Sequence, residues 1–588
     1  MNWSYTMNSP PGAFCLVLHT HLPYVLGHST WPHGASMLYE ATAECYLPLL
    51  RTFRRLMYEG IRPRVTLGLT PIVVEQLADD RFKEWFPHYL DNRIEMAEAN
   101  RGEFSFSGEK HLEWLAGLWI ERYRELQRVY HEELERDIVG AFRELQEQHG
   151  IEIMCSGATH GYFPLLHEDS SIQAQIRQGV STHLRHFGRH PRGFWLPECA
   201  YRPRGHWAPP AIVKRPDGHT WPRKGVEELL GENGLDYFII DSHLLRAGGD
   251  PLPVDVNYED TMGKLWGRIH RRTDEGPRPS WEKTTHWGYF VGSQFEDHPP
   301  VACLTRNPGV SHQVWSADHG YPGDEYYMEF HKKHQPGDHH YWRITDDQNR
   351  LETKAQYSPE MAEQRVREHA GHFASMVHDI MQAQPRPHGR RPMICAPFDA
   401  ELFGHWWHEG PMWLEQVIRY MHGDYRVEMM TGHEYLSDTP PSTAVSLPEG
   451  SWGAGGGHYI WLNDETAWSW RRIHEAERRM RDLAQRFEGT IDEQLQAFVR
   501  QAARELLLLQ ASDWQFLIST SGAPDYAAHR LVSHHSDFNR VADLAERWAR
   551  KEQLSDEDWA WFGDLCNRDR PFPDLKPEWF AKVDYPAQ

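Results

Sequence analysis

The chain repeats one pattern that few folds accommodate: a short apolar stretch ends abruptly in polar or acidic residues, and a helical stretch follows. The clearest case begins at Gly193, where Phe194 and Trp195 lead into Pro197-Glu198-Cys199. Short apolar stretches bounded in this way are typical of buried strands. Because α/β proteins keep their functional groups at the carboxyl ends of their strands, we predict that Glu198 lies at the mouth of a sheet.

A second apolar stretch leads into two more acids. Residues 392–398 have the pattern of a strand, and Asp399 and Glu401 follow. Two carboxyl groups that flank a glycosidic bond, one attacking and one moving a proton, are the usual equipment of glycoside chemistry. Glu198 and one of these acids therefore predict a hydrolase or a transferase. Side chains alternate along a strand, which puts Glu401 on the same side as Asp399, so spacing alone leaves both acids open as the partner.

Other apolar stretches predict the rest of a sheet. They lie at residues 14–18, 64–69, 151–157, 237–240, 301–304 and 427–431, separated by helical stretches that include 37–58, 170–187 and 358–384. Seven or eight strands that alternate with helices predict an α/β protein built on a TIM-like β/α barrel. We expect three insertions in it: a helical one at about 81–149, a Pro-rich one at about 202–235, and a long loop at about 245–300 that covers the site.

The pattern changes after residue 438. Helical stretches then follow one another without strands, at residues 464–486, 489–510, 526–551 and 555–566. We therefore predict two domains, a catalytic barrel over residues 1–438 and an all-helical domain over residues 439–588. Trp452 stands in a Gly-rich stretch near the start of the second domain. Asp513 stands at a helix end, where a helix cap and a ligand contact are equally good interpretations.

Two histidines follow the first predicted strand. Side-chain alternation puts His19 and His21 on one face, which suits a zinc ion, although a buried structural histidine is the common alternative. No third ligand stands at a matching spacing, so we favour hydrogen bonds from these histidines to sugar hydroxyls or carboxylates. A metal-dependent hydrolase that uses both histidines with Asp241 is the rival hypothesis. We expect no metal and no other cofactor.

Charge and composition exclude several classes of partner. The chain has 62 basic and 84 acidic residues, and its net charge of −22 opposes binding to nucleic acid or to an anionic membrane surface. No stretch approaches the ~20 apolar residues that span a bilayer, and the first residues lack a secretory signal. Seven scattered cysteines fit buried thiols in a reducing compartment. We therefore expect a cytoplasmic protein. Its 25 tryptophans offer flat apolar faces that suit sugar rings, although most are expected in the core.

Five short motifs, taken in order, resemble those of glycoside hydrolase family 57, and within it the 1,4-alpha-glucan branching enzymes. The resemblance covers most of the chain. The matching stretches are His19–Tyr24, Gly157–His160, Trp195–Tyr201, Phe398–Trp406 and Ser512–Trp514.

The resemblance implies an incomplete (β/α)7 barrel whose active site is completed by the helical domain, and a retaining mechanism that needs no metal. It makes Glu198 the nucleophile and Asp399 the general acid and then the base, which leaves Glu401 in a supporting position. By the same matching, Arg306, Gly323, Trp452 and Asp513 contact the glucan, and the catalytic subsite is lined by His19, His21, His160 and Trp407.

The activity implied is cleavage of an alpha-1,4-glucan and transfer of the chain to a 6-hydroxyl, which forms an alpha-1,6 branch. An alpha-amylase or a 4-alpha-glucanotransferase on the same scaffold is the nearest alternative. A glucan-binding protein without catalysis is a more distant one, which the paired acids oppose. The family shields its intermediate from water with a tyrosine in a loop. The candidates in the 245–300 loop are Tyr258 and Tyr289, with Trp266, Trp281 and Trp287 as further cover.

Overall fold

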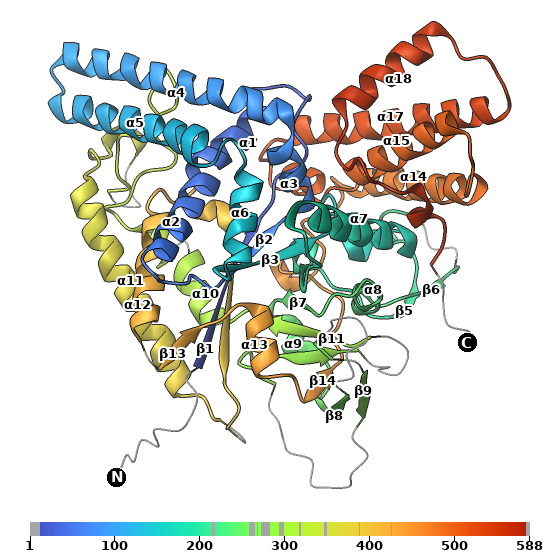
Figure 1. Cartoon of the computed structure of the whole chain (residues 1–588), viewed down its shortest axis with the longest axis horizontal. Coiled ribbons are helices and arrows are strands. Elements are labelled where there is room, and N and C mark those ends of the chain that lie inside the picture. Colours follow the sequence, from blue (N-terminus) through green and yellow to red (C-terminus); the bar gives the residue numbers. More distant parts are fainter. Residues whose placement is uncertain are drawn as a thin grey trace.

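The computed structural model describes residues 12–583, apart from 215–217, 258–264, 267, 272–282, 293–298, 317–318, 346–349, 387–388 and 425. It combines a large, mostly parallel sheet with a helical C-terminal region, which lies on one side of the sheet in Figure 1. Both features are as the sequence predicts. The domain boundary near residue 438 stays a prediction.

Seven parallel strands form the centre of the sheet. Their spatial order is β12 (Met393–Asp399), β1 (Gly12–Thr20), β2 (Val65–Leu69), β3 (Ile151–Ser156), β4 (Gly193–Trp195), β7 (Tyr237–Ile240) and β11 (Val301–Thr305). A parallel bridge then joins Arg306, just after β11, to Cys395 of β12, so the path of strands returns to its start. The short strand β13 (Val427–Met429) also pairs with β1. Nearly all side chains of these strands are buried, as expected for a parallel sheet covered on both faces.

Helices separate the strands along the chain. In order they are α1 (Ala35–Ala41), α2 (Leu47–Tyr58), α3 (Pro71–Ala78), α4 (Asp80–Ser107), α5 (Lys110–Arg128), α6 (Ile138–Glu147), α7 (Asp169–Phe187), α8 (Val226–Glu232), α10 (Pro308–Trp315), α11 (Pro359–Gln382), α12 (Gly410–Gly423) and α13 (Gly432–Asp438). In α2 the buried residues Leu49, Phe53 and Leu56 recur at helical spacing, which turns one face of the helix to the core. Within the stretch 81–149, α4 and α5 form a long pair that projects at one edge of the molecule (Figure 1).

The predicted long loop at 245–300 is wrong for its described parts. These form α9 (Ser242–Ala247), β8 (Leu252–Asn257), β9 (Arg268–Arg271) and β10 (Tyr289–Val291), which extend the sheet beyond β11 together with β14 (Thr443–Val445). The strands are three to six residues long, too short for a clear periodic signal in the sequence.

The aromatic residues of this segment belong to the core. Trp266 is buried, packs edge-on against Phe290 and donates from Nε1 to the carbonyl of Pro300. Trp287 is buried as well. Tyr289 is buried in β10 and its hydroxyl donates to the carbonyl of Thr284, which contradicts the shielding role considered for it. Tyr258 and Trp281 lie outside the described residues.

The C-terminal region contains α14 (Ala467–Arg486), α15 (Glu493–Leu509), α16 (Asp513–Ser519), α17 (Pro524–Ala549) and α18 (Asp556–Arg568). Four of these were predicted within a few residues. The sequence missed α16, because seven residues make too few turns for the apolar period to be recognised.

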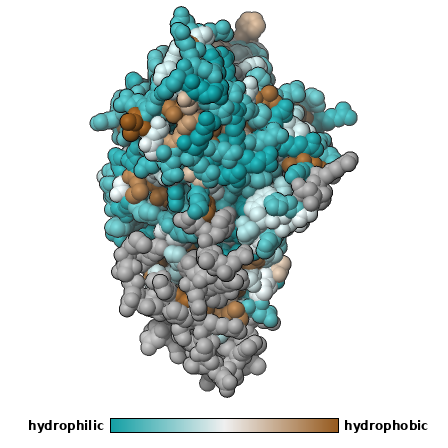
Figure 2. All heavy atoms as spheres, turned by 90° about the vertical axis from the view of Figure 1, so that its right-hand side faces the viewer, coloured by the Kyte–Doolittle hydropathy of each residue, from teal (hydrophilic) through white to brown (hydrophobic). Residues whose placement is uncertain are grey.

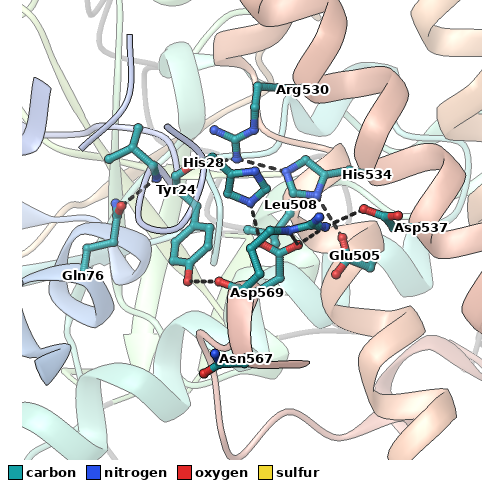
Figure 3. A network of polar contacts seen from close by, with 12 residues as sticks. Tyr24, His28, Gln76, Glu505, Leu508, Arg530, His534, Asp537, Asn567 and Asp569 are labelled. Carbon is teal, nitrogen blue, oxygen red and sulfur yellow. Dashed lines mark hydrogen bonds and ion pairs between the residues drawn. The ribbon is translucent and has the colours of Figure 1, made fainter. Parts of the chain in front are cut away.

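A buried polar network fastens this region to the loop that follows β1 (Figure 3). Nε2 of His28 in that loop donates a hydrogen bond to the carboxylate of Asp569, beyond α18. Arg530 of α17 donates a 2.7 Å hydrogen bond to the carbonyl of Tyr24. The loop is therefore attached to the C-terminal region through both its backbone and its side chains.

Hydrogen bonding fixes the protonation of His534 at the centre of the same network. Arg530 can only donate, so Nε2 of His534 accepts from it at 3.0 Å. Nδ1 of His534 is left to donate to Glu505 at 2.8 Å. Burial, the larger cause, and the charge of Arg530 lower the pKa of His534 well below its ordinary value, which agrees with a neutral ring.

The face of the molecule in Figure 2 is mainly hydrophilic and carries only small, separate hydrophobic patches. Among the helices that the structure describes, none combines the length and apolar character needed to cross a lipid bilayer.

Close packing of α7 on β3 gives a test of the fold. A Cβ atom on Gly179 of α7 would lie 2.2 Å from the carbonyl oxygen of Ser156. We expect Gly179→Ala to lower the free energy of unfolding by about 1–3 kcal/mol, because the backbone must move. At Gly117 of α5 no atom lies within 4 Å of the added Cβ, so Gly117→Ala should stabilise by up to about 1 kcal/mol. Denaturant titrations of both variants check this, and equal effects would contradict the described packing.

Candidate active site

The carboxyl ends of the parallel strands bring the predicted residues together. The register of β1 on β12 places His19 beside Asp399. Glu198 follows β4, and Arg306 follows β11. Parallel strands share the edge at which they end, so these four residues, far apart in the sequence, meet at one end of the sheet.

Glu198 is held in an unusual backbone conformation. Its φ of 60° lies in the left-handed region, which is uncommon for a residue with a side chain. Its carboxylate accepts a 2.9 Å hydrogen bond from Nε1 of Trp452 on one oxygen and another of 2.9 Å from the hydroxyl of Ser512 on the other. The backbone N–H of Trp452 also donates to the carbonyl of Glu198. Residues from beyond 439 therefore orient this carboxylate.

A chain of hydrogen bonds leads from the sheet to the same carboxylate. Ser512 uses its only hydrogen on Glu198, so its oxygen accepts from Nδ1 of His160 at 2.9 Å. Nε2 of His160 is then an acceptor, and Nε2 of His19 donates to it at 3.1 Å. Burial is the main cause that lowers the pKa of both histidines well below the ordinary value. Each ring is therefore neutral, with one defined tautomer.

His21 is different because it faces an acid. Its Nε2 lies 2.8 Å from Asp513, its Nδ1 lies 3.2 Å from the hydroxyl of Thr70, and its ring stacks on that of His160 at 4.0 Å. Burial alone would lower the pKa of His21, but the charge and hydrogen bond of Asp513 raise it above its ordinary value. The charged form of His21 is therefore favoured more than that of His19 or His160, and its charge acts to lower the pKa of Glu198.

The two predicted catalytic carboxyls have different surroundings. Burial, and then the negative charges of Glu401 and Glu198, raise the pKa of Asp399 well above its ordinary value, against the opposing charge of Arg306. Burial also raises the pKa of Glu198, but the hydrogen bonds from Trp452 and Ser512 act in the opposite direction. Asp399 is therefore the group suited to hold a proton at neutral pH, and Glu198 the group suited to act ionised.

Glu401, the rival left open by strand alternation, has structural partners. One of its oxygens accepts from the hydroxyl of Tyr46 at 2.6 Å and from the backbone N–H of His21 at 3.2 Å. Its position thus supports the histidine loop, and its charge acts on Asp399.

Three further residues predicted to bind the glucan, Arg306, Gly323 and Trp407, have different surroundings. Arg306 pairs with Asp241 at 3.2 Å. Gly323 is exposed at the end of a short 3-10 turn. Trp407 is buried, and its ring contacts are with the aromatic side chains of Tyr327, Phe403 and Trp413 rather than with the carboxyls.

The metal-dependent alternative finds no support in this arrangement. Asp241 pairs with Arg306 and His243 instead of joining the two histidines. Both ring nitrogens of His21 are engaged by Asp513 and Thr70.

Sequence reasoning missed several residues that support the site. Ser512 stands next to Asp513 in a recognised motif, and that adjacency was the only available signal. Trp195 stacks on His19 at 4.4 Å and approaches Trp452 at 5.3 Å, and Tyr46 binds Glu401. No local sequence pattern distinguishes Trp195 and Tyr46 from aromatic residues of the core.

Known proteins resemble this chain in sequence and fold. The model of glycosyl hydrolase family 57 matches residues 15–448, and a model of the C-terminal region of 1,4-alpha-glucan branching enzymes matches residues 472–580. A 1,4-alpha-glucan branching enzyme from Thermococcus kodakarensis is 39% identical over 95% of this chain and 77% of its own length.

Solved structures of related proteins have a similar fold. A branching enzyme of the same family from Pyrococcus horikoshii superposes with a TM-score of 0.84 at 35% identity, over 98% of each chain. An alpha-amylase from Thermotoga maritima superposes with a TM-score of 0.78 at 26% identity, over 98% of this chain and all of that one. The matched family model spans well over half of the sequence. This protein therefore belongs to glycosyl hydrolase family 57.

Proposed function

We propose that this protein is a 1,4-alpha-glucan branching enzyme, which cleaves an alpha-1,4-glucan and transfers the released chain to a 6-hydroxyl. The observation that carries the proposal is the hydrogen bond from Ser512 to Glu198. Ser512 lies inside the stretch that matches the C-terminal region of branching enzymes, so that region contributes directly to the site. Relatives named as branching enzymes are also more similar to this chain than the alpha-amylase is, which disfavours the amylase alternative.

The first step is proposed to form a covalent intermediate. Asp399 donates its proton to the glycosidic oxygen while the carboxylate of Glu198 attacks the anomeric carbon. The bond between that carbon and the oxygen breaks, and the leaving chain departs with a new 4-hydroxyl. Ser512 and Trp452 keep the attacking oxygens in place, so little reorientation is needed during the reaction.

The second step returns the enzyme to its starting state. Asp399, now ionised, accepts the proton of a 6-hydroxyl on another glucan chain, and the oxygen attacks the anomeric carbon. The bond to Glu198 breaks, and two inversions leave the original configuration retained. Water in place of the 6-hydroxyl would give hydrolysis instead.

The other site assignments are proposals of the same kind. Asp513 and Trp452 are adjacent to Glu198 through the contacts described, and Arg306 acts on Asp399, so their positions support a role in glucan binding. We also infer that the parallel strands form a barrel, because the bridge from Arg306 to Cys395 links the last strand to the first. With seven strands in place of the usual eight, it is the incomplete (β/α)7 barrel expected.

Removal of the nucleophile tests the function. Glu198→Gln keeps the shape of the side chain but removes its charge, so activity on amylose should fall by roughly a thousandfold or more. Product from the unaltered enzyme should release new short chains when treated with a debranching enzyme. Gly117→Ala serves as the active control. Amylose that yields no new chain ends after incubation with the unaltered enzyme would reject branching, and turnover retained by Glu198→Gln would reject the nucleophile.

The Ser512 hydrogen bond should be visible in the pH profile. It lowers the pKa of Glu198, so Ser512→Ala raises that pKa. Because Glu198 acts ionised, the acidic limb of kcat/KM should move upward by about one pH unit, the worth of one hydrogen bond to a charged group. Ser512→Thr retains a hydroxyl and should restore the limb. An acidic limb that stays in place in Ser512→Ala would show that the bond does not act on the nucleophile.

Glu401 should affect the opposite limb. Its charge raises the pKa of Asp399, and glutamine removes that charge while keeping an oxygen for Tyr46 and His21. Because Asp399 must be protonated in the first step, the basic limb of kcat/KM should move to lower pH in Glu401→Gln. Glu415→Gln, which alters a buried carboxyl of α12 paired with Arg419, is the control and should leave the limb unmoved. A shift to higher pH would contradict the assignment of the acid.

A further inference from the structure

Two exposed aromatic residues of the C-terminal region follow, within a few residues of the sequence, the two side chains that donate to Glu198: Tyr459 follows Trp452, and Phe516 follows Ser512. The exposed fraction of Phe516 is 43%, and that of Tyr459 is 70%. Single exposed aromatics are common on protein surfaces, so exposure alone decides nothing. The position of these two relative to Glu198 is what distinguishes them.

Helix α16 leads away from the catalytic carboxylate. Ser512, immediately before it, donates to Glu198, and Asp513, its first residue, pairs with His21. Phe516 and Ser519 follow at intervals of three, and residues three apart are neighbours on a helix surface. Each interval advances about 4.5 Å along the axis. A short strip of surface therefore starts at Asp513, next in the sequence to the donor of Glu198, and passes Phe516.

The strip continues onto the loop that carries Tyr459. The side-chain amide of Asn463 donates to the carbonyl of Tyr459 at 2.9 Å and to the hydroxyl of Ser519 at 2.8 Å. The neighbouring His458 is held between the hydroxyl of Tyr162, at 2.8 Å, and Glu449, at 2.7 Å. The loop is thus fixed against the end of α16 and does not depend on a ligand for its position.

We propose that Phe516 and Tyr459 form a binding strip for an alpha-glucan chain, outside the subsite at which Glu198 and Asp399 react. The inference rests on the proposed function for the identity of the ligand. An aromatic ring offers a flat apolar face to the CH groups of a pyranose, and tyrosine adds a hydroxyl for the sugar hydroxyls. Continuity with the active site selects the occupant: a polymer held by Asp513 and Trp452 extends over whatever surface adjoins them.

The strip should matter for long substrates and much less for short ones. We expect Phe516→Ala and Tyr459→Ala each to raise KM for amylose by about threefold to tenfold, the worth of one aromatic contact. The increase in KM for maltotriose should be clearly smaller. The double variant should give the larger effect and should change the distribution of branch lengths, measured by chromatography after debranching. Phe516→Tyr keeps an aromatic face and should restore the amylose KM.

Phe106→Ala is the matched control. Phe106 is 96% exposed near the end of α4, far along the chain from these residues, so its removal should change neither KM. Thermal unfolding of every variant checks that folding is intact. Equal KM values for amylose in the double variant and the unaltered enzyme would overturn the strip even if branching is observed. A raised amylose KM with no alpha-1,6 linkages in the product would uphold the strip and reject branching.

Discussion

The placement of one carboxylate depends on contacts made across the whole chain. Glu198 sits in a left-handed backbone conformation, and its two oxygens receive donors from Trp452 and Ser512. Neither donor belongs to the parallel sheet that delivers Glu198. A buried carboxylate without such donors would hold a proton and could not attack as the proposed mechanism requires. The attachment of the C-terminal region is therefore a condition for the chemistry as well as for the shape of the molecule.

That attachment is itself built from buried polar groups. The hydrogen bonds from His28 to Asp569 and from Arg530 to the carbonyl of Tyr24 join the loop after β1 to the C-terminal region. Separating the two parts would leave the buried carboxylate of Asp569 and the guanidinium of Arg530 without these partners, which is unfavourable in a protein interior. The same loop begins at His21, so the network that fixes the interface also fixes a residue of the site.

Burial raises the pKa of both Glu198 and Asp399, and the groups around each then make the two pKa values differ. Glu198 faces hydrogen-bond donors, which favour its charged form, whereas Asp399 faces two other carboxyls, which favour its neutral form. One desolvated pocket can thus hold one ionised and one protonated carboxyl at the same pH, as the proposed mechanism requires. Glu401 contributes to this difference although its own hydrogen bonds are structural.

The sequence predicted the parts of the site that local patterns encode. Glu198 and Asp399 each end an apolar stretch. Because a parallel sheet brings such strand ends together, their proximity can be predicted without information on any other contact. The contact of Ser512 with Glu198 was not predicted, because the two residues lie 314 positions apart and no local pattern identifies a hydroxyl that donates to a carboxylate. The segment 245–300 was predicted as a loop because its strands are too short to show alternation. Trp407 was assigned by motif, yet its ring packs among core aromatics.

The order of residues along the chain has a consequence for biosynthesis. The sheet, Glu198 and Asp399 are all synthesised before the ribosome reaches Ser512. A nascent polypeptide can thus assemble its strands early and still lack the donor that orients Glu198. Under the proposed mechanism, a chain released from the ribosome before Ser512 is made carries both acids but cannot carry out the attack on the glycosidic bond.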